Sequence, residues 1–274
     1  MQDDTRDLIE RALAEDLGTG DVTSEATILP ESASLAAMLA KQDLVLAGID
    51  VAREVFLRID RDIRFTPFAK DGDHVNAGTE IAKLSGNTRA LLAGERVALN
   101  LLQHLSGIAT LTARFVTAIK GSKAQVLDTR KTLPGLRQLE KYAVRMGGGK
   151  NHRMGLYDMI LIKDNHIRAA GNITKAIDSA RKKAGQLKVE VETSNLEEVR
   201  SALAARADII MLDNMPIDLM RQAVDLIAGQ ALVEASGNVT LETVRAIAET
   251  GVDFVSSGSL THSAPAADIS MKIK

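Results

Sequence analysis

A repeating alternation of short apolar runs and helical segments occupies the C-terminal half of this 274-residue chain. Runs that are apolar along their whole length are typical of strands buried on both faces of a parallel sheet. Because right-handed crossovers place the connecting helices outside such a sheet, the alternation predicts an α/β barrel or a doubly wound sheet. The strand candidates are 125–129, 159–163, 187–192, 207–213, 231–236 and 254–258, and the helix candidates between them are 173–183, 196–205, 217–227 and 241–249.

The N-terminal part of the chain has a different pattern. Apolar residues at helical spacing predict helices over 7–17 and 49–59, and short strands are expected at 34–41, 43–48 and within 71–85. A longer helical region follows at 87–119, and we expect a break in it at Ser106-Gly107. Six C-terminal strands are fewer than the eight of a complete TIM barrel. No G-x-G-x-x-G follows the first of them, which argues against a dinucleotide-binding fold.

Composition excludes several classes of site. Hydrophobic residues make up 45% of the chain but aromatic residues only 3%, so the core must be aliphatic. The absence of cysteine excludes disulfides, cysteine nucleophiles and cysteine metal sites, and is compatible with a reducing compartment. No apolar run reaches membrane-spanning length, and the acidic, amphipathic start is unlike a signal peptide. We therefore expect a cytoplasmic protein without membrane contacts.

The stretch from Arg130 to Arg168 is strongly basic. Nine Lys and Arg residues and three acidic residues give it a net charge of +6, in a chain whose formal net charge is −2. Such a local positive field, interrupted by glycine turns, suits a small polyanion. Tyr142 and Tyr157 are its only aromatic residues, so it is a poor candidate for binding nucleic acid.

Polar residues stand at the end of each strand candidate. One such residue could be a helix N-cap, but six consecutive strands that end this way indicate a shared site at the carboxyl rim of a barrel. The residues are Asp128 to Lys131, Lys163 to Asn165, Glu190 and Glu192, Asp213 and Asn214, Glu234 and Ser236, and Ser256 to Ser259.

The predicted rim divides into a basic, an acidic and a glycine-containing part. Arg binds planar carboxylates in a bidentate manner, so the basic part suits a di- or polycarboxylate. Glu192 and Asp213, with no histidine or cysteine cluster, suit Mg²⁺ bound partly through water and ligand phosphates. Small residues with free backbone N–H groups can hold a phosphate. The basic residues are Arg130, Lys131, His152, Arg153 and Lys163, and the phosphate candidates are Ser236, Gly237, Asn238, Ser257, Gly258 and Ser259.

Several of these residues have a second interpretation. His152, taken alone, would more often be a structural histidine than an acid or base. Lys163 lies in an apolar strand, where lysine is almost never buried without a partner, and it could form a Schiff base as in barrel aldolases. Arg96 begins a polar stripe at helical spacing, which is either a solvated helix face or an arginine presented to an anion.

Long contiguous motifs resemble the quinolinate phosphoribosyltransferase family. The strongest are DTRKTLPGLRQLEKYAV from Asp128, GGGKNHRMGL from Gly147 and LIKDNHI from Leu161. The resemblance extends over nearly the whole chain through EDLGTGDVTS, ERVALNLLQHLSGIAT, EVET, DIIMLDNM, EASGN and SSGSLTHSAPAADIS. Many members have two glycines where this chain has Gly237-Asn238. Since Asn tolerates the left-handed conformation best after Gly, we expect the turn to be kept.

The resemblance implies an incomplete α/β barrel of the type II phosphoribosyltransferase kind over residues 106–263. An N-terminal α/β open-sandwich domain would comprise residues 1–105, joined by the C-terminal segment 264–274. The implied partner is a second copy of the chain: a homodimer with a shared active site, or a higher oligomer built from it. The implied reaction joins quinolinate to phosphoribosyl pyrophosphate, with Mg²⁺, and releases pyrophosphate and CO₂ to give nicotinate mononucleotide.

The resemblance also implies roles for individual residues. Substrate contacts would come from Thr129, Arg130, Lys131, His152, Arg153, Lys163, Glu192 and Asp213, and Arg96 would come from the partner subunit. Lys131, Lys163, Glu192 and Asp213 would be catalytic, with the two acids near the ribose hydroxyls and Mg²⁺. The phosphate loop would include Ser236, Gly237, Asn238 and Gly258. The alternatives are a homologue that acts on another base, a Schiff-base lyase that uses Lys163, and a binding protein without activity.

Overall fold

The computed structural model describes residues 3–274, and these form two compact units. Unit 1 comprises the described residues up to Ala113, together with Pro134–Gly148 and Ala264–Lys274, and unit 2 comprises Arg114–Leu133 and Gly149–Ser263. The expected boundary after residue 105 falls inside one helix, α4 (Thr88–Ala118), which continues into unit 2. Segment 264–274 groups with the N-terminal residues, whereas Pro134–Gly148, expected in the barrel, also belongs to unit 1.

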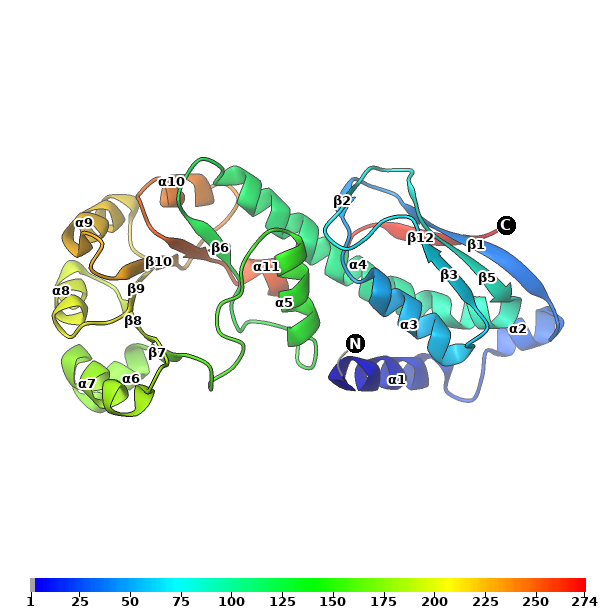
Figure 1. The fold of residues 1–274 in the computed structure, drawn as a ribbon, viewed down its shortest axis with the longest axis horizontal. Coiled ribbons are helices and arrows are strands. Elements are labelled where there is room, and N and C mark those ends of the chain that lie inside the picture. The colour runs from blue at the N-terminus through cyan, green and yellow to red at the C-terminus, as the bar shows by residue number, and fades with distance from the viewer. Residues whose placement is uncertain (1–2) are drawn as a thin grey trace. The chain divides into compact units, whose positions relative to one another are not determined.

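Unit 2 contains a six-stranded parallel sheet of strand order β6-β11-β10-β9-β8-β7. All six strand candidates are confirmed, with ends that differ by at most two residues. The sheet curves with its helices on the outside (Figure 1). Among the described residues no strand pairing joins β6 to β7, so this barrel is incomplete. The strands are β6 (Gln125–Leu127), β7 (Ile160–Ile162), β8 (Val189–Thr193), β9 (Ile209–Asp213), β10 (Leu232–Ser236) and β11 (Phe254–Ser256).

Two helices of unit 2, α7 and α8, begin at side chains that cap them, and each buries apolar residues. The side chains of Asn172 and Asn195 accept hydrogen bonds from the first turns of α7 and α8. Ile173 and Ile177, one turn apart, are buried on α7. These helices therefore fix the spacing of the strands whose carboxyl ends carry the polar residues. The helices are α6 (Asp164–Ala170), α7 (Ile173–Ala184), α8 (Leu196–Ala204), α9 (Ile217–Ile227), α10 (Val244–Ala248) and α11 (Ser259–His262).

Unit 1 is built on a four-stranded antiparallel sheet of order β12-β1-β5-β3, with a separate β2-β4 pair. The central strand β1 pairs with β12, from the end of the chain, and with β5. This pairing explains why the C-terminal segment belongs to the N-terminal unit. Its strands are β1 (Ala33–Ala40), β2 (Leu44–Val45), β3 (Arg64–Pro67), β4 (His74–Val75), β5 (Glu80–Asn87) and β12 (Ile269–Ile273), and its other helices are α1 (Asp3–Leu17), α2 (Val22–Thr27), α3 (Ile49–Ile59) and α5 (Arg137–Met146).

The predicted break at Ser106-Gly107 is wrong, because α4 runs without interruption through both residues. A Cβ atom on Gly107 would lie 2.1 Å from the carbonyl oxygen of Pro265, so this glycine permits close packing. The Ser106 hydroxyl accepts a hydrogen bond from the Ala47 N–H at 3.1 Å and donates one to the Ala47 carbonyl at 3.2 Å. Packing within unit 1 therefore explains both residues.

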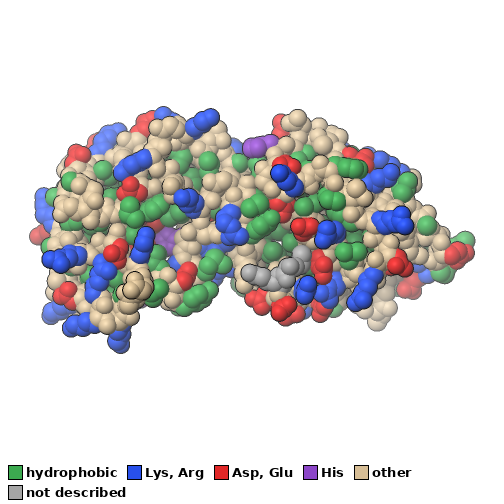
Figure 2. All heavy atoms as spheres, in the orientation of Figure 1, with side chains coloured by type: hydrophobic (Ala, Val, Ile, Leu, Met, Phe, Trp, Pro, Cys, Tyr) green, Lys and Arg blue, Asp and Glu red, His purple; other side chains and the backbone are tan. Residues whose placement is uncertain are grey.

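Charged side chains are mixed over the surface. On the face shown in Figure 2, Lys and Arg are interspersed with Asp and Glu over both units, and no large patch of one sign is visible there. Within residues 3–274, no helix combines the length and the apolar character needed to span a bilayer. The separation of charge that the sequence predicts is found inside unit 2.

Candidate active site

A cavity of about 1130 Å³ opens at the carboxyl ends of the parallel strands of unit 2. All the predicted site residues except Arg96 line it, together with Glu234, Asn214 and His262. Parallel strands end at one edge of their sheet, so polar residues far apart in sequence converge there. A smaller cavity of about 510 Å³ lies around the amino ends of β9 and β10, where Arg181 and Asp208 are paired with each other at 2.9 Å.

The register of the strands arranges the interior side chains in layers. Glu192 on β8 is paired with Met211 on β9, and Met211 with Glu234 on β10. Asp213, two residues beyond Met211, is paired with Ser236 one layer closer to the rim. Residues two apart on a strand point to the same face, so all five side chains face the cavity. Glu192 and Asp213 are thus on neighbouring strands, as expected, but in adjacent layers.

The basic part of the cavity is formed by Arg130, Lys131, Arg153 and Lys163. Burial lowers the pKa of Arg153 from its ordinary value, and the nearby guanidinium of Arg130 lowers it further. An anion between these two groups would therefore be stabilised by both. Nη1 of Arg153 donates a hydrogen bond to the carbonyl oxygen of Met159 at 3.2 Å. Nζ of Lys163 is in contact with Oε1 of Glu192, which joins the basic part to the acidic part.

The loop after β6 is fixed by local hydrogen bonds. The Lys131 N–H donates to the Thr129 hydroxyl at 3.1 Å, and the Thr261 hydroxyl of α11 donates to the Lys131 carbonyl at 2.7 Å. Thr129 therefore shapes the turn that carries Arg130 and Lys131.

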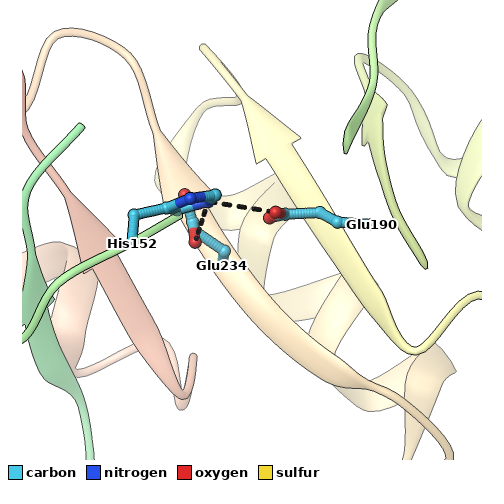
Figure 3. A group of neighbouring side chains, drawn as sticks. All are labelled: His152, Glu190 and Glu234. Carbon is cyan, nitrogen blue, oxygen red and sulfur yellow. Dashed lines mark ion pairs between the residues drawn. The ribbon is translucent and has the colours of Figure 1, made fainter. Parts of the chain in front are cut away.

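His152 lies against two buried glutamates from different strands (Figure 3). Its Nε2 is 3.0 Å from Oε2 of Glu190 on β8 and 3.5 Å from Oε2 of Glu234 on β10. Its Nδ1 accepts a hydrogen bond from the Arg153 N–H at 2.7 Å. Glu190 is fully buried and Glu234 is 1% exposed. Burial raises the pKa of Glu234 well above its ordinary value, and the carboxylate of Glu190 raises it further.

The turn after β10 has the conformation expected for phosphate binding. Gly237 has φ +90° and Asn238 has φ +52°, so the expectation that Asn238 keeps a left-handed turn is confirmed. A Cβ atom on Gly237 would lie 2.2 Å from Oδ1 of Asn214, and Nδ2 of Asn238 donates to the same oxygen at 2.9 Å. After β11, the hydroxyls of Ser257 and Ser259 are 2.7 Å apart. These two turns border the same cavity.

The basic stretch of the sequence is not one binding surface. Arg130, Lys131, Arg153 and Lys163 line the cavity of unit 2, but Arg137, Lys141 and Arg145 lie on α5 in unit 1, where Lys141 is fully buried. The sequence pattern predicts no helix between the first two strand candidates, whereas the structure has the amphipathic helix α5 there. Arg96 is exposed on α4 in unit 1 and is absent from the described lining of the cavity.

Glu190 and Glu234 were noted at the strand ends but given no role. Each is a charged residue in a predicted buried strand, as Lys163 is, and charged residues are almost never buried without a partner. The same argument applied to these two residues predicts that each has a buried partner. Their shared partner, His152, comes from a loop distant in sequence, and no sequence spacing connects the three.

Domains of the quinolinate phosphoribosyl transferase family match almost the whole chain. The N-terminal domain of that family matches residues 21–106, and the C-terminal domain matches residues 108–272. The chain belongs to the quinolinate phosphoribosyl transferase family. The family resemblance and the fold class inferred from the sequence are therefore confirmed.

Members of the quinolinate phosphoribosyl transferase family from bacteria are similar to this chain along its length. The probable nicotinate-nucleotide pyrophosphorylase (carboxylating) of Bacillus subtilis (strain 168) is 48% identical over 267 residues, 97% of this chain and 92% of that protein. The nicotinate-nucleotide pyrophosphorylase structure from Francisella tularensis has a TM-score of 0.96 at 43% identity, covering 99% of this chain and 96% of that one. NadC from Streptococcus pyogenes has a TM-score of 0.95 at 45% identity, covering 98% and 96%.

Proposed function

We propose that this protein transfers the phosphoribosyl group of phosphoribosyl pyrophosphate to quinolinate and releases pyrophosphate and CO₂, giving nicotinate mononucleotide for NAD synthesis. The observation that carries the proposal is one cavity with a paired-guanidinium part, a carboxylate part and a left-handed glycine turn. The names of the relatives that match nearly the full chain support it.

The basic part suits the two carboxylates of quinolinate. Arg130 and Arg153 repel each other in the absence of an anion, so a dicarboxylate between them relieves the repulsion and gains bidentate hydrogen bonds. Lys131 and Lys163 border the same space and add two further cations. A base with one carboxylate would leave part of this charge without a counterion, which disfavours a homologue that acts on such a base.

The acidic part and the two turns suit the phosphoribosyl moiety. Ser236, Gly237 and Asn238 offer backbone N–H groups to the 5′-phosphate, with Ser257 to Ser259 beside them. Glu192 and Asp213 line the same cavity and would face the ribose. Carboxylates near ribose C1 stabilise the positive charge that develops there as the pyrophosphate leaves.

The donor set also fits Mg²⁺. Asp213 lines the cavity and has its one described polar contact with Nδ2 of the adjacent Asn214 at 3.0 Å, while Glu192 is held by Lys163. Two carboxylates and no nitrogen ligand agree with a cation bound partly through water and ligand phosphates. When bound, Mg²⁺ neutralises the charge that develops on the departing pyrophosphate.

The chemistry follows from these positions. The ring nitrogen of quinolinate forms a bond to ribose C1, and the bond from C1 to the pyrophosphate oxygen breaks. The bond from the ring carbon beside the nitrogen to its carboxylate also breaks, and CO₂ leaves. The electron pair left on that carbon is stabilised by the adjacent positive nitrogen and by Lys163, and then takes a proton. No side chain acts as a nucleophile in this scheme.

Lys163 is poorly suited to the alternative role of a Schiff-base lysine. A Schiff base forms from a neutral amine. In this structure the amine is in contact with the carboxylate of Glu192, and this contact would have to break before the amine could attack a carbonyl group. Borohydride with a carbonyl substrate would trap an adduct on a Schiff-base lysine, and we expect none.

A second copy of the chain would complete the site. Arg96 is exposed on α4, and the family resemblance implies that it belongs to the active site of the partner subunit. We therefore propose a homodimer in which Arg96 of one subunit adds a cation to the dicarboxylate site of the other.

The absence of cysteine from the whole sequence supports a cytoplasmic location.

The direct test combines purified protein with quinolinate, phosphoribosyl pyrophosphate and Mg²⁺. We expect nicotinate mononucleotide, pyrophosphate and CO₂ in equal amounts, and no product when any component is omitted. Nicotinate replaces quinolinate in a parallel reaction. Turnover of nicotinate but not of quinolinate would refute the assignment of the base, and no turnover of either would refute the activity.

A further inference from the structure

The loop that carries Arg153 is in contact with buried acids from β8, from β10 and from the residue after β6. Asp128, fully buried beyond the end of β6, accepts hydrogen bonds from the His152 N–H at 2.9 Å and from the side chain of Asn151. Within the loop, the Asp158 carboxylate accepts from the Met154 N–H at 2.7 Å. Glu190 of β8 and Glu234 of β10 contact His152 from the other side (Figure 3).

The hydrogen bonds of His152 define its tautomer. Nδ1 accepts the Arg153 N–H at 2.7 Å, so Nδ1 carries no hydrogen. The hydrogen of the imidazole is therefore on Nε2, the nitrogen that faces Glu190 and Glu234. Nδ1 is hydrogen-bonded to the backbone of Arg153, and Nε2 is in close contact with two buried carboxyl groups.

We propose that Glu190 and Glu234 are positioning residues that act through His152 to fix the backbone of Arg153, and thereby the direction in which its guanidinium enters the cavity. The inference deepens the proposed function, because the ligand that this arginine would hold is the dicarboxylate base. Nη1 of Arg153 is itself held by the Met159 carbonyl at 3.2 Å. Backbone and side chain of the arginine are thus both anchored before a ligand binds.

The energetics favour a functional reason for this arrangement. Two adjacent buried carboxylates cost folding free energy, and replacing buried ionic groups by apolar residues often stabilises a protein. The cost is reduced by two nearby cations, since Arg153 interacts with Glu190 and Lys163 interacts with Glu234. Bidentate binding of a carboxylate depends on the position of the arginine guanidinium, since a displacement of 1 Å can reduce a rate about a hundredfold.

A divalent cation explains the cluster less well. The ligand atoms of His152, Glu190 and Glu234 lie within 4.8 Å of one another, a spacing that could hold a metal. A metal ion on Nε2 would require the imidazole hydrogen to be on Nδ1, because a metal-bound histidine donates its other N–H. Nδ1 is instead the acceptor of the Arg153 N–H. Bound metal would therefore contradict the inference.

The experiment compares Glu190→Leu and Glu190→Gln, since Gln keeps an oxygen that can accept from His152. We expect Glu190→Leu to raise the KM for quinolinate about tenfold or more, with little change in the KM for phosphoribosyl pyrophosphate. Glu190→Gln should restore most of the affinity. The control is Asp253→Asn, a half-buried acid at the amino ends of the strands that accepts from the Val233 N–H at 2.8 Å. It should lower the melting temperature and leave both KM values unchanged.

A second background tests whether the effect passes through Arg153. In Arg153→Ala, adding Glu190→Leu should raise the KM for quinolinate less than about twofold, because residues in one network are not additive. An equal effect in both backgrounds, an equal rise in both KM values, or stoichiometric metal in the purified protein would overturn the inference. If Glu190→Leu does not fold, His152→Leu removes the acceptor of the Arg153 N–H and carries the same expectations.

Hydrogen exchange separates this inference from the proposed function. The Arg153 amide should exchange slowly in the wild type without ligand and faster in Glu190→Leu, with Asp253→Asn as the control. Unchanged exchange would overturn the positioning role whatever the substrate is. Faster exchange in a protein that does not convert quinolinate would leave the positioning role intact and refute the proposed function.

Discussion

Replacing Lys163 by methionine removes a charge at the junction of the two parts of the cavity. Lys163→Met keeps the unbranched apolar stem and is shorter by one heavy atom. Two interactions are lost: the contact with Glu192 that the structure contains, and the contact with a substrate carboxylate that we propose. The two interactions are expected to differ in free energy, so measurements of stability and of activity distinguish the two roles of Lys163.

The ion pair itself contributes little stability. The side chain of Lys163 is 44% exposed and that of Glu192 is 16% exposed. A pair this accessible is typically worth about 1 kcal/mol or less, which corresponds to a shift in melting temperature of about 2–4 °C for a protein of this size. A hydrogen bond to a charged ligand group is worth about 1.5–3 kcal/mol, which lowers kcat/KM roughly ten- to hundredfold.

Steady-state kinetics with quinolinate give kcat/KM, and thermal unfolding gives the melting temperature of the same preparation. The matched control is Lys123→Met, because Lys123 forms an ion pair with Asp253 at 2.8 Å away from the cavity. We expect a similar small change in melting temperature for both variants and a loss of kcat/KM for Lys163→Met alone. If Lys163→Met lowers the melting temperature but keeps kcat/KM within about twofold, Lys163 has a structural role and the site assignment is wrong.

Three further predictions concern other parts of the molecule. Asp213→Asn should lower kcat strongly and weaken binding of phosphoribosyl pyrophosphate with Mg²⁺, while calorimetry shows quinolinate binding kept or tightened; a purely thermal effect would contradict this. Mixing inactive Arg96→Ala with inactive Lys131→Ala should restore activity through heterodimers, and no recovery after demonstrated subunit exchange would count against a shared site. The pKa of Glu234 is raised on folding, so the folded state keeps a proton that the unfolded state has lost above its ordinary value of 4.5. Stability should therefore fall as pH rises from that value toward the folded pKa, and Glu234→Gln should reduce this slope in denaturant titrations at several pH values.

The sequence determines the architecture of the barrel because each strand carries its own signal. Apolar runs without alternation identify strands buried on both faces, and the polar residues after them identify the rim. The positions of Lys163, Glu192, Asp213 and the Ser236 to Asn238 turn follow from this local information. Their convergence in one cavity follows from parallel strands ending at one edge.

Tertiary packing decides the features that local signals cannot encode. Gly107 has the appearance of a helix breaker, but it allows the backbone near Pro265 to approach an unbroken α4. Lys141 belongs to the basic stretch, yet α5 carries it into the interior of unit 1. In both cases the neighbouring sequence is typical of one role, but packing against residues distant in the sequence gives the residue a different role.

The contacts of His152 show the same limit inside the site. Glu190 and Glu234 come from strands separated by β9, and His152 comes from a loop that precedes both strands in the chain. The residues meet because strand register places the two carboxylates on the same interior face. Sequence thus determined which residues reach the rim. The register of the sheet, which depends on hydrogen bonds between strands distant in sequence, decided which of them touch.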